Sequence, residues 1–197
     1  CILEYTTTDG KMLSLCEDVF ESLIVSHTYT DKGVVIFDEP IAIIGNRAFF
    51  WCRNLSSITI PDSVTAIGED AFNGCGRLNS IIIPNSVINI GTRAFSDCRS
   101  LTSITIPDSV TTIGELAFRG CESITSITIP NSTTAIGLNC FQDCCRLSEY
   151  KGKFASDDGK CLIINGELYS FAPFELTEYT IPNSVTVIGA NVFKECK

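Results

Sequence analysis

Residues 101–123 read LTSITIPDSVTTIGELAFRGCES, and near-copies of this stretch fill most of the chain. The next block, 124–146, reads ITSITIPNSTTAIGLNCFQDCCR, so the same residue types return in the same order after 23 residues. A fixed period of this length is the signature of a repeat protein in which each unit stacks on the next. Two columns are conspicuous: Phe49, Phe72, Phe95, Phe118 and Phe141, and Cys52, Cys75, Cys98, Cys121, Cys144 and Cys196.

The pattern inside one unit predicts its path. Apolar and polar residues alternate over 103–106, which indicates a short strand with one buried side. Pro107 ends that strand because it has no N–H to donate, and Gly114 is expected to allow a sharp change of direction. Residues 115–121 are expected to form one helical turn, since their apolar residues are spaced by three and four. We therefore predict an α/β solenoid of right-handed coils, whose strands pair in a parallel β-sheet.

The repeat resembles a known family. The pattern LxxIxIPxxVxxIGxxAFxxC, found at 55–77, 78–100, 101–123 and 124–146, is similar to the BspA-like leucine-rich repeats of bacterial surface and secreted proteins. With partial matches, the resemblance covers roughly four-fifths of the chain. It implies a leucine-rich-repeat coil. It also implies a role in adhesion to host matrix proteins or other cells, although the motif defines no binding residue.

Upstream of the regular repeats the pattern weakens. One period before 55–77, inward columns fall on Val35, Phe37, Ile41 and Ile44, so we expect repeats over 33–197. Residues 1–32 do not fit the period and are predicted to form an N-terminal cap. Within the cap, 5–13 is expected to form strand, Asp-Gly turn and strand, and 17–25 a short helix or strand.

Downstream, one coil is six residues longer than the others. It spans 147–175, and Asn165-Gly166 between two apolar runs predicts a β-hairpin that replaces the usual strand and turn elements. The pattern then resumes and stops inside a repeat at Lys197, from which we expect a truncated C-terminal end or docking against another chain. Cys1 is either a lipid-bearing first residue or simply where the sequence begins.

Composition excludes several classes of function. The net charge of −9 argues against nucleic-acid binding, which requires clustered Lys and Arg. No apolar run is long enough for a membrane-spanning helix. The periodic cysteines are predicted to be buried free thiols. The single histidine, His27, has no partner motif, and Asp157-Asp158-Gly159 is a turn signal, so we expect no enzyme, no metal site and no cofactor.

Function is then expected on the variable surface. The strand positions that face solvent are candidate partner-binding residues, although Ser and Thr are also simply good residues for an exposed strand. They are Ser57, Thr59, Ser80, Ile82, Ser103, Thr105, Ser126 and Thr128. Trp51 is a candidate anchor if it points outward, the alternative being packing against the cap. Tyr169 belongs to the aromatic-rich hairpin, which is either a binding feature or filler of the enlarged coil.

Two roles fit these observations. The leading hypothesis is a noncatalytic protein-binding or adhesion module of a bacterial protein that is extracellular or at the cell surface, with or without a lipid anchor. Its partners would be host matrix proteins or another cell surface. The alternative is a structural spacer that displays other domains and has no ligand of its own. The sequence leaves the oligomeric state open.

Overall fold

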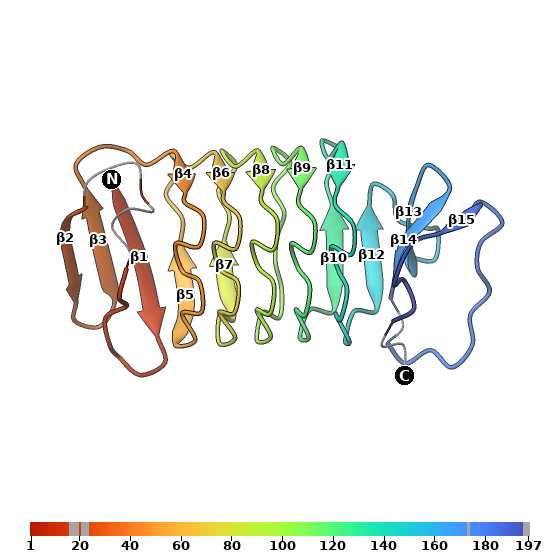
Figure 1. The fold of residues 1–197 in the computed structure, drawn as a ribbon, viewed down its shortest axis with the longest axis horizontal. Coiled ribbons are helices and arrows are strands. Elements are labelled where there is room, and N and C mark those ends of the chain that lie inside the picture. The colour runs from red at the N-terminus through yellow and green to blue at the C-terminus, as the bar shows by residue number, and fades with distance from the viewer. Residues whose placement is uncertain (16–19, 21–23, 173, 195–197) are drawn as a thin grey trace.

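The chain forms a row of stacked coils (Figure 1) in a computed structural model that describes residues 1–15, 20, 24–172 and 174–194. Every regular element is a β-strand, and the described residues contain no helix, so the molecule is a β-solenoid and the α/β class was wrong. The N-terminus lies at one end of the row and the hairpin region at the other.

The strands form four sheets. The first consists, in spatial order, of β2 (Ile24–Tyr29), β3 (Gly33–Phe37), β1 (Ile2–Thr7), β5 (Leu55–Thr59) and β7 (Ser80–Ile82). The second consists of β11 (Ala135–Ile136), β9 (Thr112–Ile113), β8 (Asn89–Ile90), β6 (Ala66–Ile67) and β4 (Ile43–Ile44). β10 (Ser126–Ile129) pairs with β12 (Glu149–Gly152), and the last sheet holds β13 (Cys161–Ile164), β14 (Glu167–Phe171) and β15 (Val187–Ile188).

The parallel register confirms the repeat period. Ile58 lies opposite Ile81 in the first sheet, and Ile67 lies opposite Ile90 in the second, so partners differ by 23 residues. One predicted strand does not form: residues 101–107 have no strand, although Ile104 is buried and Thr105 is exposed as the alternation predicted. Inside–outside patterning therefore persists where ladder hydrogen bonding does not.

The predicted helical turn is replaced by a ladder of turns. In the coil at 91–98, Arg93 and Asp97 have positive φ angles of 52° and 56°, which interrupts a right-handed helix. The N–H of Phe95 donates to the carbonyl of Ala117 in the next coil at 2.8 Å, and that of Ser96 donates to the carbonyl of Arg93 at 3.1 Å. N–H groups thus alternate between the next coil and tight turns, and none of these makes the i→i−4 bond of a helix.

The glycine column lets the backbones of consecutive coils approach closely. A Cβ built on Gly91 would lie 2.7 Å from the carbonyl carbon of Gly68 and 2.9 Å from the nitrogen of Glu69. Gly114 meets the backbone of the preceding coil in the same way, and its φ is not in the left-handed region. A turn does follow Gly114, at residues 115–120, but glycine is required there by the close approach of consecutive backbones and not by a left-handed φ.

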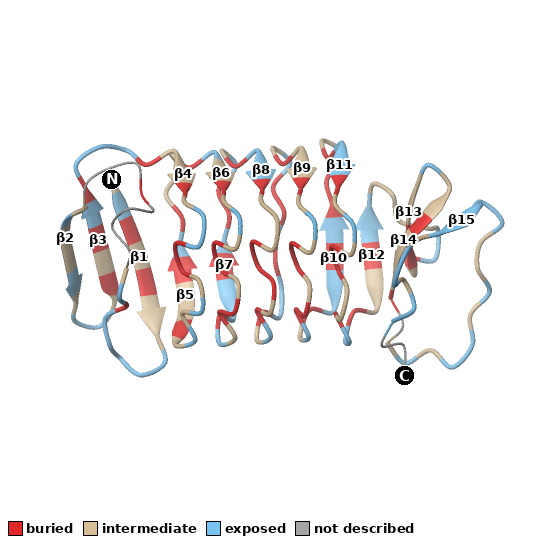
Figure 2. Cartoon of the chain, viewed as in Figure 1, coloured by how far each residue is buried: buried red, intermediate tan, exposed pale blue. Residues whose placement is uncertain are grey.

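A single core runs along the solenoid (Figure 2). The rings of the phenylalanine column are fully or nearly fully buried and stack almost parallel, with Phe72 and Phe95 5.2 Å apart at 2° and Phe95 and Phe118 5.4 Å apart at 4°. These are offset stacks between rings on successive coils. The predicted interior is confirmed for this column.

At the N-terminal end, β1 lies between β3 and β5 and is antiparallel to both. The strand that was expected to begin the first coil near Val34 therefore does not stack directly on the coil at 55–77. The Asp-Gly turn follows β1, but residues 11–15 form no strand, so the second strand predicted there was wrong. Most of 17–25 lies outside the described residues, and β2 begins at Ile24.

The hairpin is present. Asn165 and Gly166 have φ angles of 52° and 81° and join antiparallel β13 and β14, the conformation that this turn type requires. The enlarged coil nevertheless keeps its first strand, because β12 pairs in parallel with β10. Leu168 of β14 lies opposite Ile188, so the hairpin supplies only the second strand of the coil.

Candidate functional site

The sheet-face candidates do project outward, with one exception. Thr59, Ser80, Ser103, Thr105, Ser126 and Thr128 are exposed, and Ile82 has 67% of its surface exposed. Ser57 is only half-buried on this face and is already engaged, since its hydroxyl lies 2.7 Å from that of Thr6 on β1. The face offers small hydroxyl groups and one aliphatic side chain.

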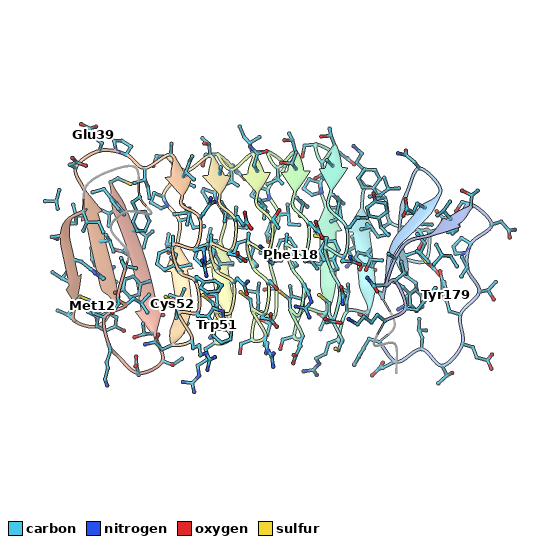
Figure 3. The ribbon with its side chains drawn as sticks, in the orientation of Figure 1. Met12, Glu39, Trp51, Cys52, Phe118 and Tyr179 are labelled. Carbon is cyan, nitrogen blue, oxygen red and sulfur yellow. The ribbon has the colours of Figure 1, made fainter. Side chains whose placement is uncertain are left out.

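Trp51 is exposed and is held by the neighbouring coil. Figure 3 labels it at the lower margin of the solenoid beside β7, whereas Phe118 lies within the coils. Trp51 has a φ of 59° and 51% of its surface exposed, and its ring packs over the backbone of Gly74, which has no side chain to displace it. The guanidinium of Arg53 lies over the ring, 4.2 Å from its centroid. A cation over an indole face is a favourable contact.

The surface beside Trp51 is hollowed into an open groove of 640 Å³. It crosses three successive coils and is lined by Trp51, Arg53, Asn54, Gly74, Gly76, Arg77, Asp97 and Arg99. Three of these eight residues are arginines and one is an aspartate. Sequence reasoning found Trp51 and missed the arginines. The sequence did contain a signal: one repeat column holds Arg53, Gly76 and Arg99. Two arginines in this column therefore lie on either side of a glycine, which has no side chain to fill the space between them.

The charged groups around the groove differ in their partners. Arg99 lies 3.5 Å from Asp97 and 3.6 Å from Glu122. Arg77 donates to the Thr8 hydroxyl at 2.9 Å, and Arg53 contacts the indole. Within the described residues, neither Arg53 nor Arg77 forms an ion pair.

A second ionic cluster lies on the turn ladder outside the groove. Arg93 binds Glu69 at 2.6 Å and Asp70 at 2.9 Å. Burial alone would raise the pKa of Asp70, but hydrogen bonds from Arg93 and Asn73 outweigh it, and the pKa is lowered. Asp70, which has a positive φ, accepts hydrogen bonds from Asn73 of its own coil and from Arg93 of the next coil. The cluster therefore links adjacent coils.

Tyr169 is half-buried and packs against the hydrophobic core. It lines a cavity of only about 30 Å³ together with Phe171 and Cys145. The neighbouring Tyr150 is buried and donates its hydroxyl to Ser170 at 2.7 Å. The hairpin aromatics therefore fill the enlarged coil to a large extent, and Tyr169 offers less free surface than Trp51.

The buried thiols form a hydrogen-bonded ladder. Cys75, Cys98, Cys121 and Cys144 each donate to the carbonyl of the phenylalanine 26 residues earlier, at 3.1–3.3 Å. Burial raises the pKa of the Cys98, Cys121 and Cys144 thiols, and that of Cys140 to about 12. Thiols in this state are poor nucleophiles. The expected inward free thiols are confirmed at these four positions, whereas Cys52, at the N-terminal end of the column, is only half-buried, and Cys196 lies outside the described residues.

A serine ladder was missed by the sequence analysis. Ser63, Ser86, Ser109 and Ser132 each donate to a carbonyl 22 residues earlier, at 2.6–2.9 Å. The signal was the constant serine two residues after each Ile-Pro pair. These hydroxyls tie neighbouring coils together and are not available for binding.

Other side chains that could take part in catalysis or binding have structural roles instead. The Tyr5 hydroxyl accepts from the N–H of Leu13 at 3.0 Å and lies 2.6 Å from Nε2 of His27. The Asp158 carboxylate accepts hydrogen bonds from the Ser156 hydroxyl, from the N–H of Lys160 and from the Tyr179 hydroxyl. These bonds stabilise the turn that contains Asp158. Among the described residues no three His, Cys, Asp or Glu side chains are grouped to hold a metal ion. In the same part of the chain, no helix could cross a membrane.

The comparisons with known proteins agree with this geometry. The model of the BspA type leucine rich repeat region matches residues 33–154 and 163–197 in six copies. The chain belongs to this family. Repeats of this type form protein-interaction or repeat modules. No curated protein matches the chain.

Three solved structures from bacteria are similar. A Bacteroides ovatus leucine-rich repeat protein is 32% identical, with a TM-score of 0.63, and the match covers 84% of this chain and 46% of that one. The Treponema pallidum (T. pallidum) leucine rich repeat protein is 36% identical, with a TM-score of 0.57 and coverage of 58% and 54%. One from Eubacterium ventriosum is 27% identical, with a TM-score of 0.64 and coverage of 77% and 42%. This BspA-type chain spans about half the length of these relatives.

Proposed function

We propose that this BspA-type chain is a noncatalytic adhesion module of a cell-surface or secreted bacterial protein, and that it binds host matrix proteins or another cell. The observation that carries the proposal is the exposed Trp51 with Arg53 over its ring, at the side of an open groove. Tryptophan and arginine are the residues that most often dominate binding energy in protein interfaces.

The sheet face is a second contact surface in this proposal. Its exposed residues from Thr59 to Thr128 follow the axis of the solenoid, as extended binding surfaces of repeat proteins do. Ile82 is the most exposed apolar side chain on it. Small hydroxyl groups add hydrogen bonding around a stronger anchor but provide little affinity alone.

A noncatalytic role is supported by the state of the candidate nucleophiles. The thiols of Cys75, Cys98, Cys121 and Cys144 are buried and hydrogen-bonded to carbonyls, and burial raises their pKa. Nε2 of His27 lies 2.6 Å from the Tyr5 hydroxyl, so this ring nitrogen is already engaged. A catalytic Cys–His pair would need a low-pKa thiol within hydrogen-bond reach of the imidazole.

The test is binding to immobilised purified laminin, collagen and fibronectin, measured by biolayer interferometry. We expect saturable binding to at least one of them, weakened about tenfold or more by Trp51→Ala. Leu138→Ala is a matched control because Leu138 is 50% exposed, as Trp51 is, but lies outside the groove. Absence of binding to all three proteins, or binding unchanged by Trp51→Ala and by Ile82→Ala, would contradict the proposal.

A structural spacer remains the second candidate function. It is favoured by the plain composition of the sheet face, which lacks aromatic and charged side chains between Thr59 and Thr128 on the outward positions. A spacer would hold its neighbours apart without a ligand. It would give no signal on any immobilised matrix protein, with the wild-type chain as with the variants.

A further inference from the structure

We propose that the groove beside Trp51 binds an acidic segment of the partner protein, with the partner's carboxylates placed between Arg53, Arg77 and Arg99. This inference rests on the proposed protein-binding function and specifies its ligand chemistry.

The groove is locally positive on an acidic molecule. The chain has a net charge of −9, yet the groove holds three arginines against Asp97. Arg53 and Arg77 have no carboxylate partner within the described chain, and Arg99 is exposed with contacts of 3.5 and 3.6 Å to two acids. Exposed ion pairs of this kind contribute little, so Arg99 can turn to a ligand at small cost.

Spacing favours an extended ligand. Successive coils are separated by about 4.8 Å, so the coils of Arg53 and Arg99 stand roughly 10 Å apart. An extended peptide advances about 3.3 Å per residue and would cross this distance with about three residues. Gly76 lies between the two arginines, and a Cβ built there would meet nothing closer than the Asp97 carbonyl at 4.0 Å. The floor of the groove is therefore open where a carboxylate would enter.

The indole favours a peptide over an acidic sugar. A sugar ring stacks on an aromatic face, but Trp51 already packs over Gly74 and lies under the guanidinium of Arg53. An acidic side chain needs no free ring face. It binds the guanidinium edge, whose planar donors match a carboxylate in two parallel hydrogen bonds.

One acid stands at the rim of the groove. Oδ1 of Asp9 accepts from Nδ2 of Asn54 at 3.0 Å and from the N–H of Lys11 at 3.2 Å. Because those donors hold it, Asp9 does not neutralise Arg53 or Arg77 through an ion pair. It is expected to limit affinity, and Asp9→Asn should therefore strengthen binding of an acidic ligand.

The experiment uses Trp51 as the reporter, since it is the only tryptophan in the chain. The probes are acetylated hexaglutamate, acetylated hexaglutamine and trigalacturonate, titrated at low salt while indole fluorescence is recorded. Anisotropy of the labelled peptide provides a second readout for variants that change the fluorescence itself. Far-UV circular dichroism and the urea midpoint establish that each variant is folded.

We expect saturable binding of hexaglutamate and none of hexaglutamine. Arg53→Gln combined with Arg77→Gln should weaken hexaglutamate binding about tenfold or more. Raising the salt to 0.5 M should have a similar effect, because the Debye length is then about threefold shorter than at 0.05 M. Arg146→Gln is the matched control because Arg146 occupies the repeat column of Arg77 outside the groove, and it should leave binding unchanged.

Three results would overturn the inference: no response to hexaglutamate, an unaltered response in the double variant, or tighter binding of trigalacturonate. The immobilised matrix proteins separate this failure from failure of the proposed function. If they bind the wild type and the double variant equally, adhesion stands and the acidic-ligand inference is lost. If neither peptide nor matrix protein binds, both are lost.

Discussion

Replacing Phe95 by alanine tests the shared interior most directly. Phe95 is fully buried and stacks on Phe72 at 5.2 Å and on Phe118 at 5.4 Å. Removal of a buried phenylalanine side chain costs about 3–5 kcal/mol of unfolding free energy, through lost transfer energy and the cavity left behind. The backbone of its coil is held to both neighbours by hydrogen bonds, which limits collapse into that cavity. We therefore expect the upper half of the range, about 4–5 kcal/mol.

The assay is urea unfolding followed by far-UV circular dichroism, with Thr105→Ala as the control. Thr105 is exposed and should change the unfolding free energy by less than about 0.5 kcal/mol. A loss at Phe95 below about 2 kcal/mol would lie under the range for a buried phenylalanine and would refute the argument. Equal losses at Phe95 and Thr105 would refute the inside–outside assignment itself.

Three further predictions concern other columns and the N-terminal strands. Gly91→Ala should destabilise the fold by about 1–3 kcal/mol through backbone overlap, whereas Gly76→Ala, with open space at its Cβ, should cost less than half as much in the same urea assay. Cys98 should stay unlabelled by a maleimide in the folded protein while exposed Cys145 reacts, and equal rates would contradict the thiol ladder. Burial lowers the pKa of His27, so the unfolded state binds its proton more readily; stability should fall as pH drops below about 6.5, and His27→Gln should remove that part of the slope.

The periodicity of the sequence was sufficient to predict that the coils stack. The phenylalanine and cysteine columns were placed inside from their spacing alone, and the structure buries Phe49 to Phe141 and Cys75 to Cys144 because a short coil can bury its apolar side chains only against its neighbours. The same spacing suggested a helical turn at 115–121, which was wrong. Apolar residues three and four apart also suit a turn ladder, and nothing in the spacing reveals that Leu116 and Gly120 adopt positive φ.

The candidate site was only partly predictable. Trp51 stood out because its column otherwise holds Gly or Asp, and its outward position was one of two open alternatives. The groove depends on arginines from three coils, and Arg77 occupies a different column from Arg53 and Arg99. Their convergence follows from side-chain directions on the turn ladder, which repeat spacing alone does not specify. Ser57 was misjudged because nothing local indicated that β1 would pair with β5.

The turn ladder and glycine column make every regular coil an interchangeable increment of length. Duplicating or deleting one 23-residue unit between Arg99, the last residue that lines the groove, and β13 would preserve the contacts on either side, since each coil meets only its immediate neighbours. Such an event would move the hairpin about 4.8 Å per coil relative to the indole while leaving both surfaces chemically unchanged. Reach and recognition can therefore evolve independently in this molecule.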